Sequence, residues 1–146
     1  MKRILMIVTY SLLFGFVQTA LAGPLDEAKA KAHLQAVADG NLDAVMRDYT
    51  EDAYMDWVGG PLDGRYRGKA AIGEVWKKFI ANNGGKPRPA KFGKPEAFAN
   101  PNGTTVATQA EYGGEHPVKV WHVLTYRDAS LATEIWQIAP AIKVSP

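Results

Sequence analysis

Histidine is the residue type in this chain best suited to acid–base chemistry, because its side chain gains or loses a proton near neutral pH. The sequence contains three histidines, His33, His116 and His122. His122 lies in the stretch VKVWHVLTYRD, residues 118–128, which has the alternation of a β-strand. Alternate residues of a strand share a side, and His122 lies on the more apolar one. It is therefore either a hydrogen-bonded core histidine or the polar group of a cavity.

A carboxylate partner for His122 is available in the next predicted strand, LATEIWQI. Glu134 and Trp136 share one face of that strand. A hairpin loop of three or five residues would place this face beside His122, whereas an even loop would place Thr133 and Ile135 there. If Glu134 is the neighbour, its carboxylate would raise the pKa of the imidazole and select its tautomer. Such a pair can act as a general acid–base group in an apolar cavity.

Other chemistries have little support in the sequence. The histidines lack the short spacing of a metal site, and His116 lies in the turn-like stretch GGEHP. The chain has no cysteine, so it offers no thiolate ligand, disulfide or thiol nucleophile. Phosphate-binding glycine loops and a nucleophilic serine elbow are absent as well. We therefore expect no metal and no cofactor.

Three helices are predicted in the first half of the domain. One follows Pro24 in LDEAKAKAHLQAVADG, and one covers KAAIGEVWKKFIANNG. Between them, Asn41 resembles an N-cap, and Leu42, Val45, Met46 and Tyr49 have helical spacing. A strand is expected over residues 53–58, followed by a glycine-rich connection, GGPLDGRYRG.

From residue 91 onward the pattern changes to strands joined by short turns. The strands are KFGKPEAFA, TTVATQAEY, VKVWHVLTY and LATEIWQI, which predict an antiparallel meander. Helices at the front and strands at the back define an α+β protein. We expect one curved antiparallel sheet packed on three helices, with a cavity between the concave sheet face and the helices.

The first 22 residues have the features of an export signal. Lys2 and Arg3 precede an apolar run, and small residues at Ala20 and Ala22 precede Gly23. The run is short for a retained bilayer anchor. We therefore expect cleavage after Ala22, export to the periplasm or the medium, no stable membrane anchor, and a single domain over residues 23–146.

The charge balance gives no support to a nucleic-acid partner. The seventeen Lys and Arg residues include Lys2 and Arg3, so fifteen remain after cleavage, against fifteen Asp and Glu residues. The mature domain is formally neutral, and the excess of basic residues belongs to the signal segment. The basic stretch KPRPAKFGK, residues 86–94, is interrupted by Pro and Gly and is expected to form a solvated loop.

Four short motifs resemble the nuclear transport factor 2-like superfamily, and within it the SnoaL-like polyketide-cyclase and ketosteroid-isomerase branch. They are the helix junction GNLDA at residues 40–44, the strand entry EDA at 51–53, the helix start GKAAI at 68–72, and the hairpin HVLTYRDASL at 122–131. The resemblance implies a cone-like, cystatin-like fold with an internal pocket, and in many members a homodimer formed through the exposed sheet face. It implies little about function, because the superfamily includes several enzyme classes and non-catalytic binding modules.

The resemblance also suggests which residues surround the pocket. His33 and His122 match the two positions that polarise the substrate ketone in the isomerases. Trp57 replaces the carboxylate that moves the proton, and the neighbouring Asp56 should face the other side of its strand. Tyr49 and Trp76 match supporting aromatic positions.

These observations lead to two competing hypotheses. In the first, the domain binds a small, mostly apolar, cyclic and carbonyl-bearing molecule, with acid–base catalysis by His122 and His33. In the second, it is a non-catalytic binding or dimeric assembly module. The residues expected to bind the small molecule are Tyr49, Trp57, Trp76, Glu134 and Trp136.

Overall fold

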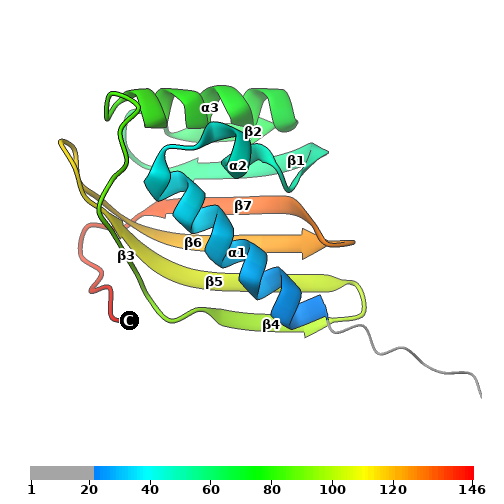
Figure 1. Cartoon of the computed structure of the whole chain (residues 1–146). Coiled ribbons are helices and arrows are strands. Elements are labelled where there is room, and N and C mark those ends of the chain that lie inside the picture. Colours follow the sequence, from blue (N-terminus) through cyan, green and yellow to red (C-terminus); the bar gives the residue numbers. More distant parts are fainter. Residues whose placement is uncertain (1–21) are drawn as a thin grey trace, which may run out of the picture.

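The computed structural model describes residues 22–146 (Figure 1). The helices lie in the first part of the described chain and five strands follow the last helix, in the order α1 (Ala22–Asp39), α2 (Leu42–Met46), β1 (Tyr49–Val58), β2 (Gly64–Arg67), α3 (Lys69–Ala81), β3 (Ala90–Phe92), β4 (Glu96–Asn100), β5 (Gly103–Tyr112), β6 (Val118–Arg127) and β7 (Ser130–Ile138).

The strands form one sheet in the order β2-β1-β7-β6-β5-β3, and β4 also pairs with β5. Every pair is antiparallel except β1 with β7, which is parallel. The predicted α+β class is therefore confirmed, but the sheet is mixed. Strands β1 and β7 come from opposite ends of the domain, so no tight hairpin requires them to run antiparallel.

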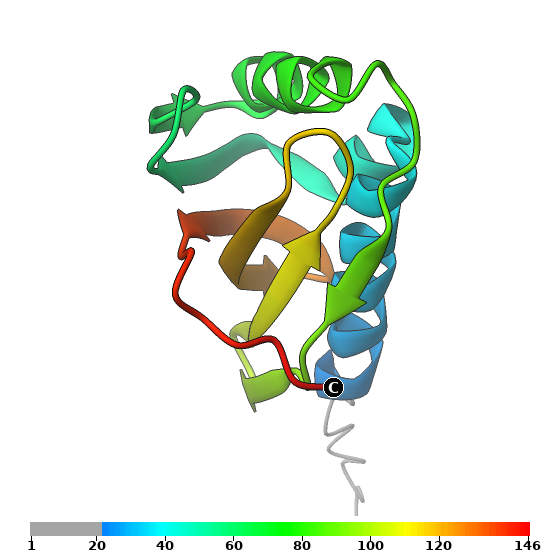
Figure 2. The same cartoon turned by 90° about the vertical axis from the view of Figure 1, so that its left-hand side faces the viewer.

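The three helices cover one face of this curved, open sheet (Figures 1 and 2). Helix α1 packs against β3, β4 and β5, whereas α3 packs against β1 and β2. Inward-facing side chains alternate along the strands, and β5 is a regular example because every second residue from Thr104 to Tyr112 is buried. The core therefore lies between the helices and the concave sheet face.

Two local predictions were wrong. Tyr49 was expected on the second helix, but α2 ends at Met46 and Tyr49 opens β1, where it pairs with Leu131. Helical spacing over so few residues does not exclude a strand, and here sheet pairing decides. The glycine-rich connection contains the short strand β2, which pairs with residues 54–57 of β1.

The basic stretch at residues 86–94 also differs from expectation. It leads into β3 as predicted, but Arg88 is buried, with 5% of its surface exposed. Its guanidinium finds backbone carbonyl acceptors that the sequence could not reveal.

The predicted export signal lies outside the described residues, apart from Ala22, which begins α1. Within residues 22–146, no helix is long and apolar enough to cross a membrane.

Candidate functional site

The hairpin between β6 and β7 decides which residues face the inside of the cone. Its loop has two residues, Asp128 and Ala129, both with positive φ, as in a type I′ turn. An even loop alone would turn Glu134 outward. However, the register changes between Thr125 and Tyr126, which leaves Ala132 of β7 unpaired as a β-bulge. The extra residue restores the inward direction of Glu134.

Glu134 therefore lies at the centre of a buried polar network, which we define as His33, Tyr49, Tyr112, His122 and Glu134. Glu134 Oε1 lies 3.4 Å from His33 Nε2 and 3.3 Å from His122 Nδ1. The Tyr49 hydroxyl donates to Glu134 Oε2. The Tyr112 hydroxyl lies 3.3 Å from His122 Nε2. All five side chains are buried, so one carboxylate collects three polar partners away from water.

This arrangement sets the charge state of the network. Burial acts to raise the pKa of Glu134, but the electrostatic influence of His33 and hydrogen bonds from the two imidazoles hold that pKa well below its usual range. Burial, followed by the repulsion of Glu134, raises the pKa of the Tyr49 hydroxyl well above its usual value. Glu134 is thus an ion at neutral pH, and Tyr49 stays a proton donor.

His122 differs from the sequence expectation in the direction of its pKa. Burial lowers the pKa of His122, and the contribution of Glu134, which raises it as predicted, is smaller. A neutral imidazole at this place would carry its proton on Nδ1, facing the Glu134 carboxylate, and accept the Tyr112 hydroxyl at Nε2. Nε2 then has a hydrogen-bond partner inside the protein, whereas Nδ1 lies close to the Glu134 carboxylate without an aligned hydrogen bond.

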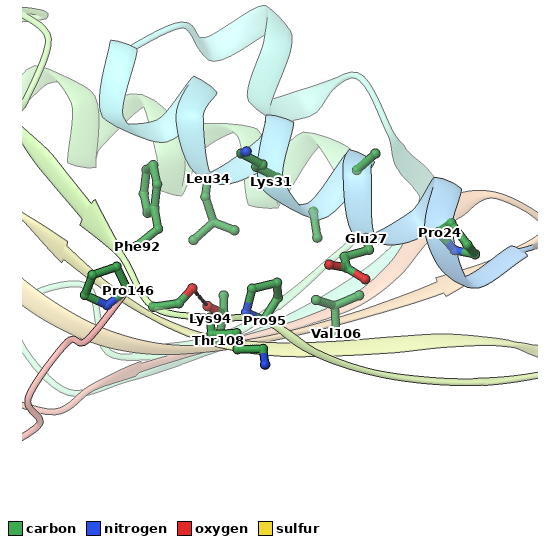
Figure 3. A pocket seen from close by; sticks show the side chains of 13 residues that line it. Pro24, Glu27, Lys31, Leu34, Phe92, Lys94, Pro95, Val106, Thr108 and Pro146 are labelled. Carbon is green, nitrogen blue, oxygen red and sulfur yellow. Dashed lines mark hydrogen bonds between the residues drawn. The ribbon is translucent and has the colours of Figure 1, made fainter.

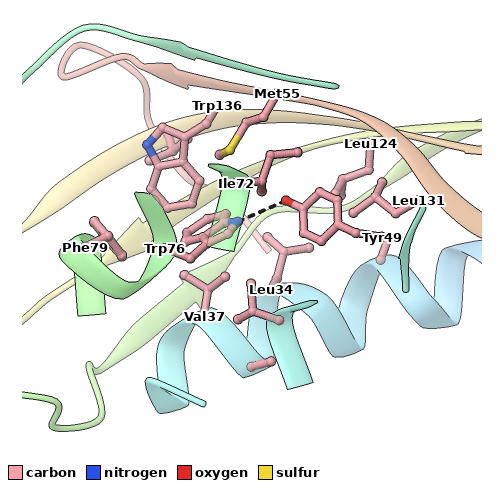
Figure 4. Close-up of a cluster of buried hydrophobic side chains, with 14 of the residues drawn as sticks. Leu34, Val37, Tyr49, Met55, Ile72, Trp76, Phe79, Leu124, Leu131 and Trp136 are labelled. Atoms are coloured by element: carbon pink, nitrogen blue, oxygen red, sulfur yellow. Dashed lines mark hydrogen bonds between the residues drawn. The ribbon is translucent and has the colours of Figure 1, made fainter. Parts of the chain in front are cut away.

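An aromatic cluster fills the interior next to this network. We define it as Trp57, Trp76, Phe79, Tyr112 and Trp136 (Figure 4 shows part of it). Trp136 stacks on Trp57 with ring centroids 4.7 Å apart and on Tyr112 with centroids 5.5 Å apart. Trp76 donates from its indole nitrogen to the Tyr49 hydroxyl over 2.9 Å. The cluster therefore packs as core and is tied to the network by hydrogen bonding.

Trp57 and Asp56 lie as the sequence predicted for their strand. Trp57 faces inward and is buried, and its indole nitrogen donates to the Gly59 carbonyl. Asp56 faces the other side, where its carboxylate lies 3.3 Å from Arg65 Nε. None of the acidic residues of β1 is buried, and the inward position next to Asp56 belongs to Trp57.

A cavity of about 560 Å³ opens at the end of the cone where Trp57 lies. We call it the mouth cavity. It is bounded by the end of β1, the β1–β2 loop, the last turns of α3, the β5–β6 loop and the end of β7. Its lining residues are Trp57, Pro61, Leu62, Lys78, Phe79, Asn82, His116, Pro117, Val118 and Ile138. Most of this lining is apolar, and its polar members lie at the C-terminal end of α3, including its C-cap Asn82, and in the β5–β6 loop.

Two buried polar residues hold the rim of the mouth cavity in place. Arg88 donates to the carbonyls of Gly113 and His116, and its guanidinium lies 4.7 Å from the Phe79 ring centroid. Asn83 accepts from the backbone nitrogen of Glu115. The β5–β6 loop is therefore fastened to the end of α3 and to the segment that follows it.

A second depression of about 580 Å³ lies on the other side of the cone, between α1 and strands β3 and β5 (Figure 3). Leu34 of α1 and Phe92 of β3 both line it, and the Thr108 hydroxyl donates to the Gly93 carbonyl on the strand side. None of the residues predicted to bind a ligand lines this groove.

Among those predicted residues, Trp57 lines the mouth cavity. Tyr49, Trp76, Glu134, Trp136 and both predicted catalytic histidines lie behind it and line neither depression. Trp136 connects the two regions, because it stacks on Trp57 and lies with its centroid 4.4 Å from that of His122.

Sequence reasoning missed several residues of the rim and the network. Tyr112 ends a predicted strand with the inward phase, so its alternation was an available signal. No comparable pattern in the sequence predicted the roles of Arg88, Asn83 and the cavity-lining Lys78. Their roles at the cavity depend on contacts between distant segments. Among residues 22–146, no group of three or more His, Asp or Glu side chains is placed to hold a metal ion.

Comparison with known proteins places this geometry in a family. The sequence profile of the SnoaL-like domain matches residues 30–134. The chain therefore belongs to the SnoaL-like domain family. No curated protein sequence matches it significantly.

Solved structures share the fold at low sequence identity. An NTF2-like protein of unknown function from Pseudomonas putida KT2440 has 16% identity and a TM-score of 0.67, over 85% of this chain and 93% of that chain. A ketosteroid isomerase-like protein from Erwinia carotovora atroseptica SCRI1043 has 17% identity and a TM-score of 0.62, over 87% and 99%. A protein with a cystatin-like fold from Nostoc punctiforme PCC 73102 has 8% identity and a TM-score of 0.63, over 80% and 90%. These likenesses establish the fold.

Proposed function

We propose that this protein binds a small, mostly apolar ring compound in the mouth cavity. A volume of about 560 Å³ falls within the roughly 300–1,000 Å³ range of small-molecule sites. The observation that carries the proposal is the position of Trp57 and Phe79, which offer aromatic surface to the cavity from inside the cone. Flat apolar molecules can stack on such surfaces.

Intrinsic tryptophan fluorescence provides the test. Titration with N-phenyl-1-naphthylamine, a neutral ring compound, should quench the emission of Trp57 at a stoichiometry of one. Val118→Phe fills part of the cavity and should weaken binding by about tenfold, or about 1.4 kcal/mol, because its ring occupies space that the compound needs.

Val58→Phe is the matched control, because Val58 is 37% exposed and does not line the cavity. It should bind like the unmodified protein. Failure of the compound to bind, or equal loss in both variants, would contradict the proposal.

Acid–base catalysis is a second candidate, supported by the ionised Glu134 and its two imidazoles. These groups lie one aromatic layer behind Trp57, so a substrate would reach them only after Trp57 and Trp136 move. Such a site suits proton transfer next to a ring carbonyl. Turnover of ketosteroid-like or polyketide-like substrates should then be lost in His122→Gln and His33→Gln. If both variants fold and turn over substrate at the rate of the unmodified protein, the imidazoles do not take part in catalysis.

We further propose a homodimer formed through the outward face of the sheet. Trp121, Val123 and Ile135 point outward on adjacent strands, and Ile135 is 36% exposed. Apolar side chains grouped on an open sheet face are suited to pairing with a second copy. Sedimentation should give twice the chain mass, and Ile135→Glu should give a monomer. A wild-type monomer at micromolar concentration would contradict this proposal.

Export is proposed on the signal-like features of residues 1–22. Expression of the full chain in a bacterial host should yield a periplasmic product that begins at Gly23. N-terminal sequencing of that product tests the proposal, and an intact N-terminus in the cytoplasmic fraction would contradict it.

A further inference from the structure

The mouth cavity has an uneven distribution of charge. Lys78 and His116 line it, and no Asp or Glu does. Asp63 and Glu115 are next to lining residues in the sequence, but both are exposed and neither lines the cavity. The charged side chain that borders the cavity, Lys78, is therefore cationic.

A second cation, Arg88, lies directly behind the lining. Its guanidinium donates to the carbonyls of Phe79 and His116, which both line the cavity. Within residues 22–146, no carboxylate lies within ion-pair distance of Arg88. Burial lowers the pKa of Arg88, which reflects the cost of holding this charge away from water.

The end of helix α3 offsets only part of this charge. The Phe79 carbonyl belongs to the last turns of α3, where the helix dipole contributes roughly half a negative charge. The guanidinium of Arg88 and the ammonium of Lys78 together carry two positive charges, which exceed the half negative charge of the helix end. The cavity is therefore net positive on the side of α3 and the β5–β6 loop. The opposite side, formed by Pro61, Leu62 and Ile138, is apolar.

We infer that the molecule bound in the mouth cavity is an amphipathic anion, with a flat apolar ring body and one acidic group. The ring body contacts Trp57 and the apolar side, and the acidic group lies near Lys78 and Asn82. This inference rests on the proposed function and adds the chemical class of the ligand. An anion there gains the electrostatic compensation that Arg88 lacks in the protein itself.

Two fluorescent compounds with the same ring body test the inference. 8-Anilinonaphthalene-1-sulfonate carries an acidic group, and N-phenyl-1-naphthylamine is its neutral counterpart. The sulfonate should bind about tenfold more tightly, because charge complementarity at a partly buried site contributes at this scale. The preference should shrink at high salt, because mobile ions screen the exposed Lys78.

Lys78→Gln removes the accessible cation without disturbing the fold, since Lys78 is exposed. It should reduce the preference to about threefold, as expected for one exposed charge pair. Lys77→Gln is the control, because Lys77 is exposed, does not line the cavity, and lies 3.9 Å from Glu74. It should leave the preference unchanged.

Each outcome decides the question. Equal affinities for the two compounds, or tighter binding of the neutral one, overturn the inference and leave the proposed function standing. The inference is also overturned if Lys78→Gln leaves the preference for the sulfonate unchanged, or if Lys77→Gln lowers that preference as much as Lys78→Gln does. In either case the anion binds elsewhere. If neither compound binds, the proposed function itself fails.

Discussion

The buried polar network and the mouth cavity differ in how their polar groups are used. In the network, Glu134, Tyr49 and the two imidazoles have polar neighbours inside the protein and almost no exposure. At the mouth, Lys78, Asn82 and His116 are exposed and border a cavity.

The difference separates two roles that residue types alone do not distinguish. A buried polar network specifies how the interior packs, because each member is costly to leave unpaired. Exposed polar groups around an apolar cavity keep their capacity to bind another molecule. We therefore expect network substitutions to change stability and mouth substitutions to change binding.

Deleting Ala132 should have the largest effect. Without this bulge residue the end of β7 reverses its faces, which turns Glu134 and Trp136 outward and brings Thr133 and Ile135 inward. Loss of the network and the aromatic stack should cost more than about 4 kcal/mol of unfolding free energy. Denaturant unfolding would measure this.

A contrasting substitution in the same hairpin keeps the register. Ala129→Gly relieves the positive φ of Ala129 and should stabilise the protein by up to about 1 kcal/mol. A deletion variant as stable as the parent would show that the bulge does not set the register.

Glu134→Leu should have the next largest effect. It removes the shared acceptor and leaves Tyr49 and both imidazoles facing apolar surroundings, at a cost of about 3–5 kcal/mol. Glu134→Gln should cost less, because its amide oxygen still accepts the Tyr49 hydrogen bond. Urea unfolding of both variants tests the comparison, and a Leu variant more stable than the Gln variant would contradict it.

Acidification should weaken the fold in two steps, both through the network. The pKa of folded His122 is lowered, so below about pH 6.5 the unfolded chain binds a proton that the folded chain resists. The pKa of folded Glu134 is also lowered, so its stabilisation is complete above about pH 4.3 and is lost at lower pH.

Unfolding free energies measured from pH 7.5 to 5 should therefore fall, and the slope should be shallower in His122→Gln. The parent loses about 1.4 kcal/mol for each unit by which folding depresses the pKa of His122. An unchanged slope in the variant would assign the pH dependence to other groups.

Leu62→Ala at the mouth should have the smallest effect on stability, within about 0.5 kcal/mol, because Leu62 is partly exposed. Binding of N-phenyl-1-naphthylamine should nevertheless weaken by about threefold, because apolar contact area is lost. Titration and unfolding of the same sample measure both quantities. A large loss of stability with unchanged binding would contradict the expectation that residues of the mouth cavity serve binding and not stability.

Much of the fold followed from local patterns. The 3.6-residue spacing in α1 and α3 and the alternation in β5, β6 and β7 predicted those elements, and the motif resemblance predicted the family. Tyr49 was assigned to a helix instead of a strand, and β2 was not predicted. Short segments satisfy helical, strand and turn patterns equally well.

The candidate site was predictable only in part. Inward positions for His122 and Trp57 follow from strand alternation alone. The contact between Glu134 and His122 could not be predicted from the length of the hairpin loop. A two-residue loop alone would turn Glu134 outward, and the bulge at Ala132 turns it inward again. Arg88 was expected in solvent. Its acceptors on the β5–β6 loop, the carbonyls of Gly113 and His116, lie more than twenty residues away in the sequence, so no local pattern predicts them.

The sequence by itself determined the elements, the α+β class and the side of each strand on which the reactive residue types lie, because these depend on spacing between near neighbours. Tertiary structure decided which of those residues meet and which face a cavity. Which residues meet depends on a register shift between strands, and which residues face a cavity depends on loop contacts between distant segments. Neither the shift nor the contacts have a pattern in the local sequence. For that reason His33 and His122, which first suggested catalysis, lie in the interior, and the cavity opens beside Trp57.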